Sequence, residues 1–253
     1  MLDSVTSGDF EIPVIQETAL SKSLVFTDLD IQSRMSLARP EELQFEYTRL
    51  MMAALLFNPH PQRVLMVGLG GGSLAKFCYK HFKHLHITAV EINPHVIALR
   101  KTFLIPDDDV RLQVVQMDAA DFVADSSQTF DVIFVDGFDH QGLPEQLCSE
   151  KFYSDCRALL TPRGLMVANL PRFSTYLQIY IDRIASVFEA PSIVVQAPGT
   201  TNSVLFAMKD SALTHAVSFS RNKPDHLSDE AWLQIRPSLA RAYLATQRMR
   251  EAA

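Results

Sequence analysis

The sequence predicts an α/β fold in which helices cover a mostly parallel sheet. Between Arg63 and Lys209, short apolar runs rich in β-branched residues alternate with longer helix-compatible stretches, as in consecutive βαβ units. A glycine-rich loop directly follows the first of these runs, and the last two runs lie too close together for a helix to fit between them. The predicted strands are Arg63–Gly68, His86–Ile92, Val110–Gln116, Phe130–Asp136, Leu165–Leu170, Ile193–Ala197 and Ser203–Lys209.

Helices are expected between these strands, with starts near Ser73, Pro94, Ala119, Ser149 and Ser174. Asn93 is a capping residue before a proline at the first helical position, and Ser149 precedes an acidic first turn. Residues 198–202 are too few for a helical crossover, so the last two strands should form an antiparallel hairpin. Five βα units followed by such a hairpin are typical of the Rossmann-like class I methyltransferase fold with its seven-stranded sheet, whereas a dinucleotide dehydrogenase continues with a sixth parallel strand.

A short N-terminal β/α extension is predicted at residues 1–57. It contains possible strands at Phe10–Gln16 and Ser23–Thr27 and an amphipathic helical pattern over Glu41–Phe57. The proline-containing segment 58–62 is the expected linker into the main domain.

The main Rossmann-like domain is predicted to span residues 63–210. Residues 211–253 form a C-terminal helical extension in this interpretation, because a polar stretch there precedes a helical pattern from about Asp229 to Met249. This final helix is expected to pack on the outside of the main domain.

Composition excludes several classes of function. Hydrophobic residues make up 47% of the 253 residues and charged residues 21%, which is the balance of a soluble globular protein. A formal net charge of -6 argues against non-specific nucleic-acid binding and suits cationic small molecules. The N-terminal residues lack a signal-peptide pattern, and no stretch reaches the ~20 apolar residues of a membrane helix. We therefore expect a cytoplasmic protein that does not bind membranes.

Cysteines and histidines give no metal-binding pattern. The three cysteines lack paired or metal-ligand spacing, so free thiols in a reducing compartment are expected. His81, His84 and His86 straddle a helix end and a strand start without neighbouring ligands, so they are interpreted as surface residues. No metal is expected.

The strongest local pattern is the run Val64-Leu65-Met66-Val67-Gly68-Leu69-Gly70-Gly71-Gly72-Ser73, which holds four of the nine glycines. A glycine loop between a buried strand and a helix lets a ligand lie against bare backbone near the helix N-terminus. The alternative is a tight turn that serves packing alone. In the context of a βα unit, we interpret Gly68, Gly70, Gly71 and Gly72 as nucleoside-binding.

Carboxylates lie at or just after the ends of the next three predicted strands, at the same edge of the sheet. Glu91 lies ~20 residues beyond the glycine loop, where an acid that accepts hydrogen bonds from ribose hydroxyls is expected. Asp118, followed by Ala119, could accept from an adenine amino group or could cap the helix after it. Asp136 and Asp139 follow a fully apolar strand, which favours a functional role for both.

The segment DGFDHQGLPE at 136–145, followed by SEKFY at 149–153, resembles the spermidine synthase motif D-[ST]-[ST]-D-P-x-G-P-x-x leading to a helix with S-x-x-F-Y. Both acids, the glycine, a proline and the Phe-Tyr pair keep their relative positions. The similarity covers roughly residues 25–210. It extends through the glycine loop, Glu91, Asp118, the strand around Leu165, Ile31-Gln32 and Tyr47.

This resemblance implies transfer of an aminopropyl group from decarboxylated S-adenosylmethionine to a small amine such as putrescine, a step of polyamine biosynthesis. Asp136 would orient and deprotonate the amine, and Asp139 and Tyr47 would hold it. The resemblance also implies a homodimer. The nucleoside ligands that it implies together with the residue patterns are Gln32, Gly68, Gly70, Gly71, Gly72, Glu91, Asp118, Ala119 and Asp136.

Several positions depart from the family pattern. The glycine loop is one residue shorter than G-G-G-D-G-G and lacks its acid, and Tyr47-Thr48-Arg49 replaces Y-H-E. Gly137-Phe138 replaces a Ser/Thr pair, and His140 replaces a proline. Since Arg49 lies two residues from Tyr47, helical spacing predicts that an inward Tyr47 goes with an outward Arg49.

Two other functions fit the same fold. One is a methyltransferase that uses ordinary S-adenosylmethionine on an unknown small acceptor. The other is a non-catalytic nucleoside-binding member of the family, which the missing loop acid and Arg49 would favour.

Overall fold

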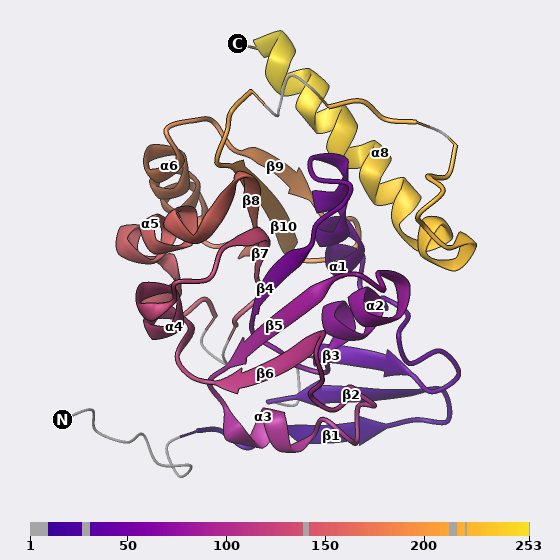
Figure 1. Cartoon of the computed structure of the whole chain (residues 1–253). Coiled ribbons are helices and arrows are strands. Elements are labelled where there is room, and N and C mark those ends of the chain that lie inside the picture. Colours follow the sequence, from indigo (N-terminus) through magenta and orange to yellow (C-terminus); the bar gives the residue numbers. More distant parts are fainter. Residues whose placement is uncertain (1–9, 27–30, 139–141, 213–216, 221, 253) are drawn as a thin grey trace, which may run out of the picture.

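A seven-stranded sheet forms the centre of the computed structural model, which describes residues 10–26, 31–138, 142–212, 217–220 and 222–252 (Figure 1). The strand order is β6-β5-β4-β7-β8-β10-β9. Strands β4 to β8 run parallel, and β10 runs antiparallel to both β8 and β9. The strands are β4 (Arg63–Val67), β5 (His86–Glu91), β6 (Leu112–Gln116), β7 (Phe130–Val135), β8 (Leu160–Pro171), β9 (Ile193–Gln196) and β10 (Asn202–Met208).

This sheet is the predicted Rossmann-like class I methyltransferase arrangement. All seven predicted strands are present, and β9 and β10 form the predicted antiparallel hairpin. Strand β8 begins at Leu160 rather than at Leu165, because Leu160 already pairs with Phe130 ahead of a register shift in β7. The pairing partner, which the sequence pattern does not reveal, sets this boundary.

Helices cover both faces of the sheet, and the core has a cluster on each face (Figure 1). Alternate residues of β4 supply the two clusters: Val64 and Met66 face one, and Leu65 and Val67 face the other. A strand buried on both faces reads as a continuous apolar run, which is why β4 was visible in the sequence. The helices between strands are α2 (Ser73–His81), α3 (Pro94–Ala98), α4 (Ala119–Asp125), η3 (Glu145–Cys148), α5 (Glu150–Leu159) and α6 (Leu177–Phe188).

The predicted helix caps are observed, with one wrong start. The Asn93 side chain accepts a hydrogen bond from the N–H of His95, and Ser149 Oγ accepts one from the N–H of Phe152. The predicted start near Ser174 is wrong, since α6 begins at Leu177. Ser174 Oγ instead accepts from the N–H of Tyr176 within the preceding turn.

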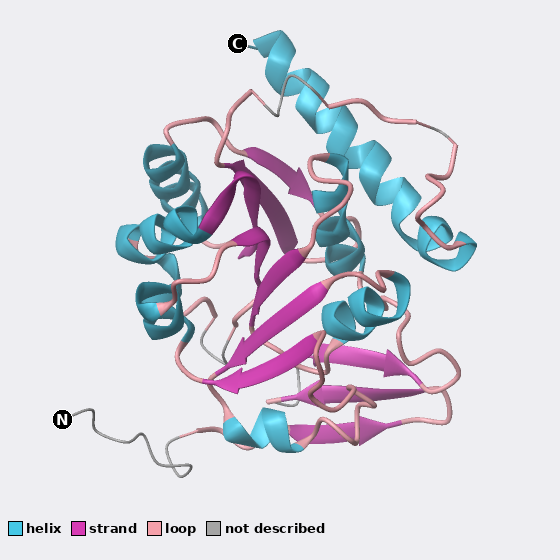
Figure 2. Cartoon of the chain, viewed as in Figure 1, coloured by secondary structure: helices cyan, strands magenta, loops and turns pink. Residues whose placement is uncertain are grey.

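The N-terminal extension has three strands, β1 (Val14–Glu17), β2 (Ser21–Val25) and β3 (Ile31–Ser36). They form a separate antiparallel sheet in the order β1-β2-β3 (Figure 2). The sequence pattern predicted the first two strands and missed β3, in which polar residues occupy half-buried positions. Thr27, the predicted end of the second strand, lies outside the described residues.

The predicted helix over Glu41–Phe57 begins later than expected. Helix α1 covers Glu46–Met51 and continues as the 3-10 helix η2 (Met52–Leu56). Leu43 is buried but not helical. Its N–H donates to the side chain of Gln234 instead of forming a helical hydrogen bond. A tertiary contact therefore replaces the first predicted turn of this helix.

Helix α8 (Asp229–Ala252) packs against η2, α1 and β9 on one face of the main sheet. The helical part of the N-terminal extension and the C-terminal helix thus share a single core cluster with the central strands. The division at residues 1–57, 63–210 and 211–253 stays a prediction.

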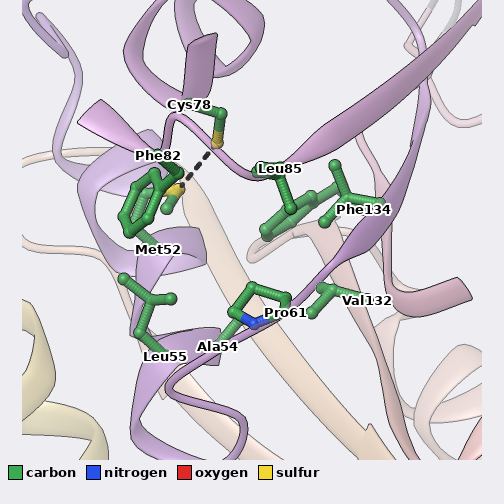
Figure 3. A pocket seen from close by; sticks show the side chains of 10 residues that line it. Met52, Ala54, Leu55, Pro61, Cys78, Phe82, Leu85, Val132 and Phe134 are labelled. Carbon is green, nitrogen blue, oxygen red and sulfur yellow. Dashed lines mark hydrogen bonds between the residues drawn. The ribbon is translucent and has the colours of Figure 1, made fainter. Parts of the chain in front are cut away.

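A small cavity lies within this core cluster (Figure 3). Apolar side chains from η2, α2, β4 and β7 line it, and the Cys78 thiol donates to Met52 Sδ over 3.8 Å. Burial raises the pKa of Cys78 to about 12, so the group remains a thiol at neutral pH. The cavity is a packing feature and not a substrate site.

All three cysteines should be unreactive in the folded protein. Cys78, Cys148 and Cys156 are free and buried, and burial raises the pKa of each thiol above its ordinary value. We expect no thiol to react with an aqueous disulfide reagent at neutral pH in the native state, and all three to react in denaturant. Rapid labelling of the native protein would contradict this expectation.

Candidate active site

The glycine loop lies against the end of β7. Gly68 has a φ of +90°, and a Cβ at this position would collide with the carbonyl oxygen of Asp136 and lie 3.0 Å from its carbonyl carbon. The N–H of Asp136 donates to the carbonyl of Val67 over 2.9 Å. Only glycine therefore allows the loop after β4 to approach the acid that follows β7 this closely.

Glu91 joins the end of β5 to the glycine loop. Its carboxylate accepts hydrogen bonds from the N–H of Leu69 and the N–H of Asn93, each over 2.9 Å. Burial raises the pKa of Glu91 above its usual value, and the backbone hydrogen bonds oppose that shift. Backbone hydrogen bonds from Leu69, Gly70, Ile92 and Asn93 thus hold the carboxylate against the glycine loop.

Asp118 caps α4, as one of its two predicted roles requires. Its Oδ1 accepts from the N–H of Ala120 over 2.8 Å, and its Oδ2 accepts a long bond of 3.4 Å from Gln146 Nε2. Ala119, the first residue of α4, is buried. A role of Asp118 and Ala119 in nucleoside binding stays a prediction.

Asp136 is the centre of a hydrogen-bonded group at the sheet edge. Asn169 Nδ2 donates to its Oδ1 over 2.8 Å, and the Tyr47 hydroxyl of α1 donates to the same carboxylate. Burial raises the pKa of Asp136 to about 6, although both donors lower it. Burial and the adjacent carboxylate raise the pKa of Tyr47 well above its ordinary value, so this hydroxyl keeps its proton.

The structure brings together Tyr47, Asp136 and the glycine loop, but not every predicted residue can be placed. Asp139 and His140 lie outside the described residues, so the predicted catalytic role of Asp139 stays a prediction. Arg49 donates to the carbonyl of Leu43 and to the Glu46 carboxylate, while Tyr47 binds Asp136. The two side chains thus point in different directions, as helical spacing predicts.

Ser33, the neighbour of Gln32 on β3, contacts the glycine loop. A Cβ on Gly71 would lie 2.6 Å from Ser33 Oγ, and Ser33 Oγ is 3.3 Å from Ser73 Oγ. Successive side chains on a strand point to opposite faces, so Gln32 projects away from the face that touches the loop. Nucleoside binding by Gln32 stays a prediction.

The sequence analysis missed two residues of this site, Asn169 and Asn202. Asn202 Nδ2 donates to Asn169 Oδ1 over 2.9 Å, so both amides connect to Asp136. One signal was present in the sequence, because Asn169 interrupts the apolar run Leu165–Leu170. Asn202 gave none, since asparagine is common in the turn that precedes a strand.

No group of three potential metal ligands occurs among the residues that the structure describes. His84 and His86 are exposed as predicted, whereas His81 is only partly so. The ring of His81 packs on Phe77 at 4.7 Å between centroids and shares a hydrogen bond of 2.9 Å with Ser228 Oγ.

Within the described residues, no helix is long and apolar enough to cross a membrane.

Comparisons with known proteins agree with the site. The spermine/spermidine synthase domain matches residues 44–219. A polyamine aminopropyltransferase of Chromobacterium violaceum is 34% identical over 222 residues, which are 87% of this chain and 85% of the relative.

Solved structures share the fold. A probable spermidine synthase from Corynebacterium glutamicum has a TM-score of 0.70 and 20% identity, covering 88% of this chain and 82% of that one. A spermidine synthase in complex with the transition-state analogue AdoDATO has a TM-score of 0.61 and 20% identity, covering 90% and 87% of the two chains. With the domain match and the relative's identity, the glycine loop and the acids after β5, β6 and β7 place this chain in the spermine/spermidine synthase family.

Proposed function

We propose that this protein transfers the aminopropyl group of decarboxylated S-adenosylmethionine to a small diamine such as putrescine. The observation that carries the proposal is the partly buried Asp136, held by Tyr47 and Asn169 beside the glycine loop. The curated relative is named a polyamine aminopropyltransferase, and one structural neighbour is bound to AdoDATO, which supports the same donor here.

The residues at the sheet edge suit a nucleoside. Glu91, at the end of β5, would accept from ribose hydroxyls in place of some of its backbone donors, and Asp118 Oδ2 would accept from the adenine amino group. The bare backbone of Gly70 and Gly71 would face the sulfonium end. The hydroxyls of Ser33 and Ser73 lie beside this loop, which lacks the acid of the family pattern.

Asp136 can supply the proton transfer that the reaction needs. An alkyl amine titrates near ~10 and is protonated at neutral pH, so its lone pair must be freed before attack. With a pKa of about 6, Asp136 is ionised at neutral pH and can accept the proton. The amine nitrogen then bonds to the aminopropyl carbon, the carbon–sulfur bond breaks, and its electron pair neutralises the sulfonium, releasing methylthioadenosine.

The test is an assay with decarboxylated S-adenosylmethionine and a panel of amines, scored by methylthioadenosine release. Release with a di- or triamine supports the proposal. Methyl transfer from S-adenosylmethionine, with no release for any amine, would assign the protein to the methyltransferases instead. Tight nucleoside binding without any turnover would favour a non-catalytic role.

Glu91→Gln should weaken methylthioadenosine binding at least about tenfold, because a hydrogen bond to a charged group contributes ~1.5–3 kcal/mol. Titration calorimetry measures the dissociation constant. Glu17→Gln is the matched control, since Glu17 is an exposed residue of β1 that pairs with Lys22. Equal affinities of the Glu91 variant and the wild type would remove Glu91 from the site.

Turnover should decline as the pH falls through about 6, because only the ionised Asp136 accepts a proton. Tyr47→Phe removes a donor that stabilises the carboxylate, so it should raise the pKa of Asp136 and move this acid limb to higher pH. A pH profile of kcat measures both effects. An acid limb that moves to lower pH in Tyr47→Phe would contradict the assignment.

A further inference from the structure

Three adjacent strands deliver polar side chains to one point of the sheet edge. Asp136 follows Val135 of β7, whose partner in β8 is Ala168, so Asp136 lies beside Asn169. Strand β10 runs antiparallel to β8, and its first residue, Asn202, pairs with Pro171. Because β10 begins where β7 and β8 end, Asn202 lies at the edge at which the parallel strands present the site.

Hydrogen bonding fixes the direction of both amides. An ionised carboxylate only accepts, so Asn169 must present its NH₂ group to Asp136. The Asn169 oxygen then faces Asn202, which must in turn donate its own NH₂ group. Both amides in this series of hydrogen bonds therefore donate in the direction of Asp136.

The surrounding structure also holds the Asn202–Asn169–Asp136 hydrogen bonds in place. Asn169 is only 2% exposed, so water has little access to replace its bond to Asp136. The turn before Asn202 is held by the N–H of Asn202 donating to Thr200 Oγ1 and by the N–H of Arg172 donating to the carbonyl of Thr201. Within the described residues, the titratable group that acts on Asp136 is Tyr47, from the opposite element α1.

We propose that Asn202 and Asn169 form an amide relay that positions Asp136 and stabilises its ionised form for proton acceptance. Both are positioning residues, and the proposal rests on the proposed function for its role in turnover. Without Asn202, the Asn169 amide is free to turn and present its oxygen, which would repel the carboxylate. In this way a residue of the β9–β10 hairpin contributes to proton acceptance by Asp136.

The first measurement needs no substrate. The carboxyl carbon of Asp136 is followed by ¹³C NMR against pH, and its resonance is identified by its loss in Asp136→Asn. Asn169→Ala should raise the titration midpoint by about one to two pH units, because it removes a donor to the charged form. Asn202→Ala should raise it in the same direction, and Asn202→Ser serves if the alanine variant does not fold.

Ser203→Ala is the matched control, since Ser203 is a buried neighbour on β10 whose side chain points to the other face. Its midpoint should equal that of the wild type. If the relay acts through Asn169, Asn202→Ala should have no further effect in an Asn169→Ala background. An unchanged midpoint in Asn202→Ala and Asn202→Ser, or a full additional shift in the double variant, would overturn the proposal.

Activity then separates the relay from the proposed function. If the wild type transfers aminopropyl groups, the acid limb of its kcat profile should move upward in Asn202→Ala, with the methylthioadenosine dissociation constant unchanged. An acid limb that stays in place while the NMR midpoint moves would overturn the catalytic role of the relay. Absence of transfer in the wild type would refute the proposed function, whereas the NMR titrations would still decide whether the relay sets the ionisation of Asp136.

Discussion

Asp136→Asn is expected to lower kcat by about 100- to 10,000-fold, which is the usual contribution of a positioned general base. The amide keeps the size of the carboxylate but cannot accept the proton of the amine. In the proposed function Glu91 and the glycine loop hold the nucleoside, and the amide keeps the size of the carboxylate, so methylthioadenosine binding should be nearly unchanged. Steady-state kinetics and calorimetry on the same preparation measure the two quantities.

The other end of β7 supplies the control. Asp131 lies at the opposite edge of the sheet, where it accepts hydrogen bonds from the N–H groups of Gln62 and Arg63 and from the Thr161 hydroxyl. Asp131→Asn should therefore reduce stability and leave kcat unchanged. Equal loss of turnover in both variants would mean that Asp136 acts through the fold, and wild-type turnover in Asp136→Asn would exclude it as the base.

The sequence predicted the sheet because its central strands are buried on both faces and read as continuous apolar runs. It predicted the glycine loop and Asp136 because each comes directly after such a run, whereas Glu91 and Asp118 were selected by their positions at the ends of β5 and β6. Strand β3 was missed because its buried positions include Ser33, which packs on the glycine loop through a contact between distant segments. A local pattern cannot report a partner that lies far away in the chain.

The amides of the site illustrate the same limit. The position of Asn202 depends on the register between β8 and β10, and antiparallel pairing alone brings a strand start to the edge where the parallel strands end. The sequence predicted the hairpin but not which of its residues would face Asp136. Similarly, the late start of α1 depends on Gln234 of α8, which accepts the N–H of Leu43.

The glycine loop lacks the acid of the family pattern, so the negative charge of the site must come from other residues. In the described part of the chain, the glycine loop is flanked by neutral hydroxyls of Ser33 and Ser73. Among the described residues at this edge, Glu91, Asp118 and Asp136 are then the acids that can attract a cationic substrate. The pocket should still favour amines, and we expect less efficient transfer to putrescine than in a relative with the full motif.

Gly68→Ala is expected to destabilise the protein by ~2–5 kcal/mol and to impair turnover as well. A non-glycine residue at a φ of +90° costs ~1–2 kcal/mol, and an added methyl group in a closely packed place costs ~1–3 kcal/mol more. The colliding atom is the backbone carbonyl oxygen of Asp136, which cannot turn away as a flexible side chain would. Relief of the collision must displace Asp136 or the loop, so kcat should fall even in the fraction that remains folded.

Gly199→Ala separates the two contributions to this loss. Gly199 also has a positive φ, +67°, but a Cβ there would meet no atom within 4 Å. Its replacement should cost only the backbone strain of ~1–2 kcal/mol. Denaturant unfolding of both variants gives the free energies of unfolding, and the difference between them measures the collision with Asp136. Equal losses of stability would mean that the end of β7 yields to the added methyl group, and the close approach of the glycine loop to Asp136 would then not be a rigid feature of the site.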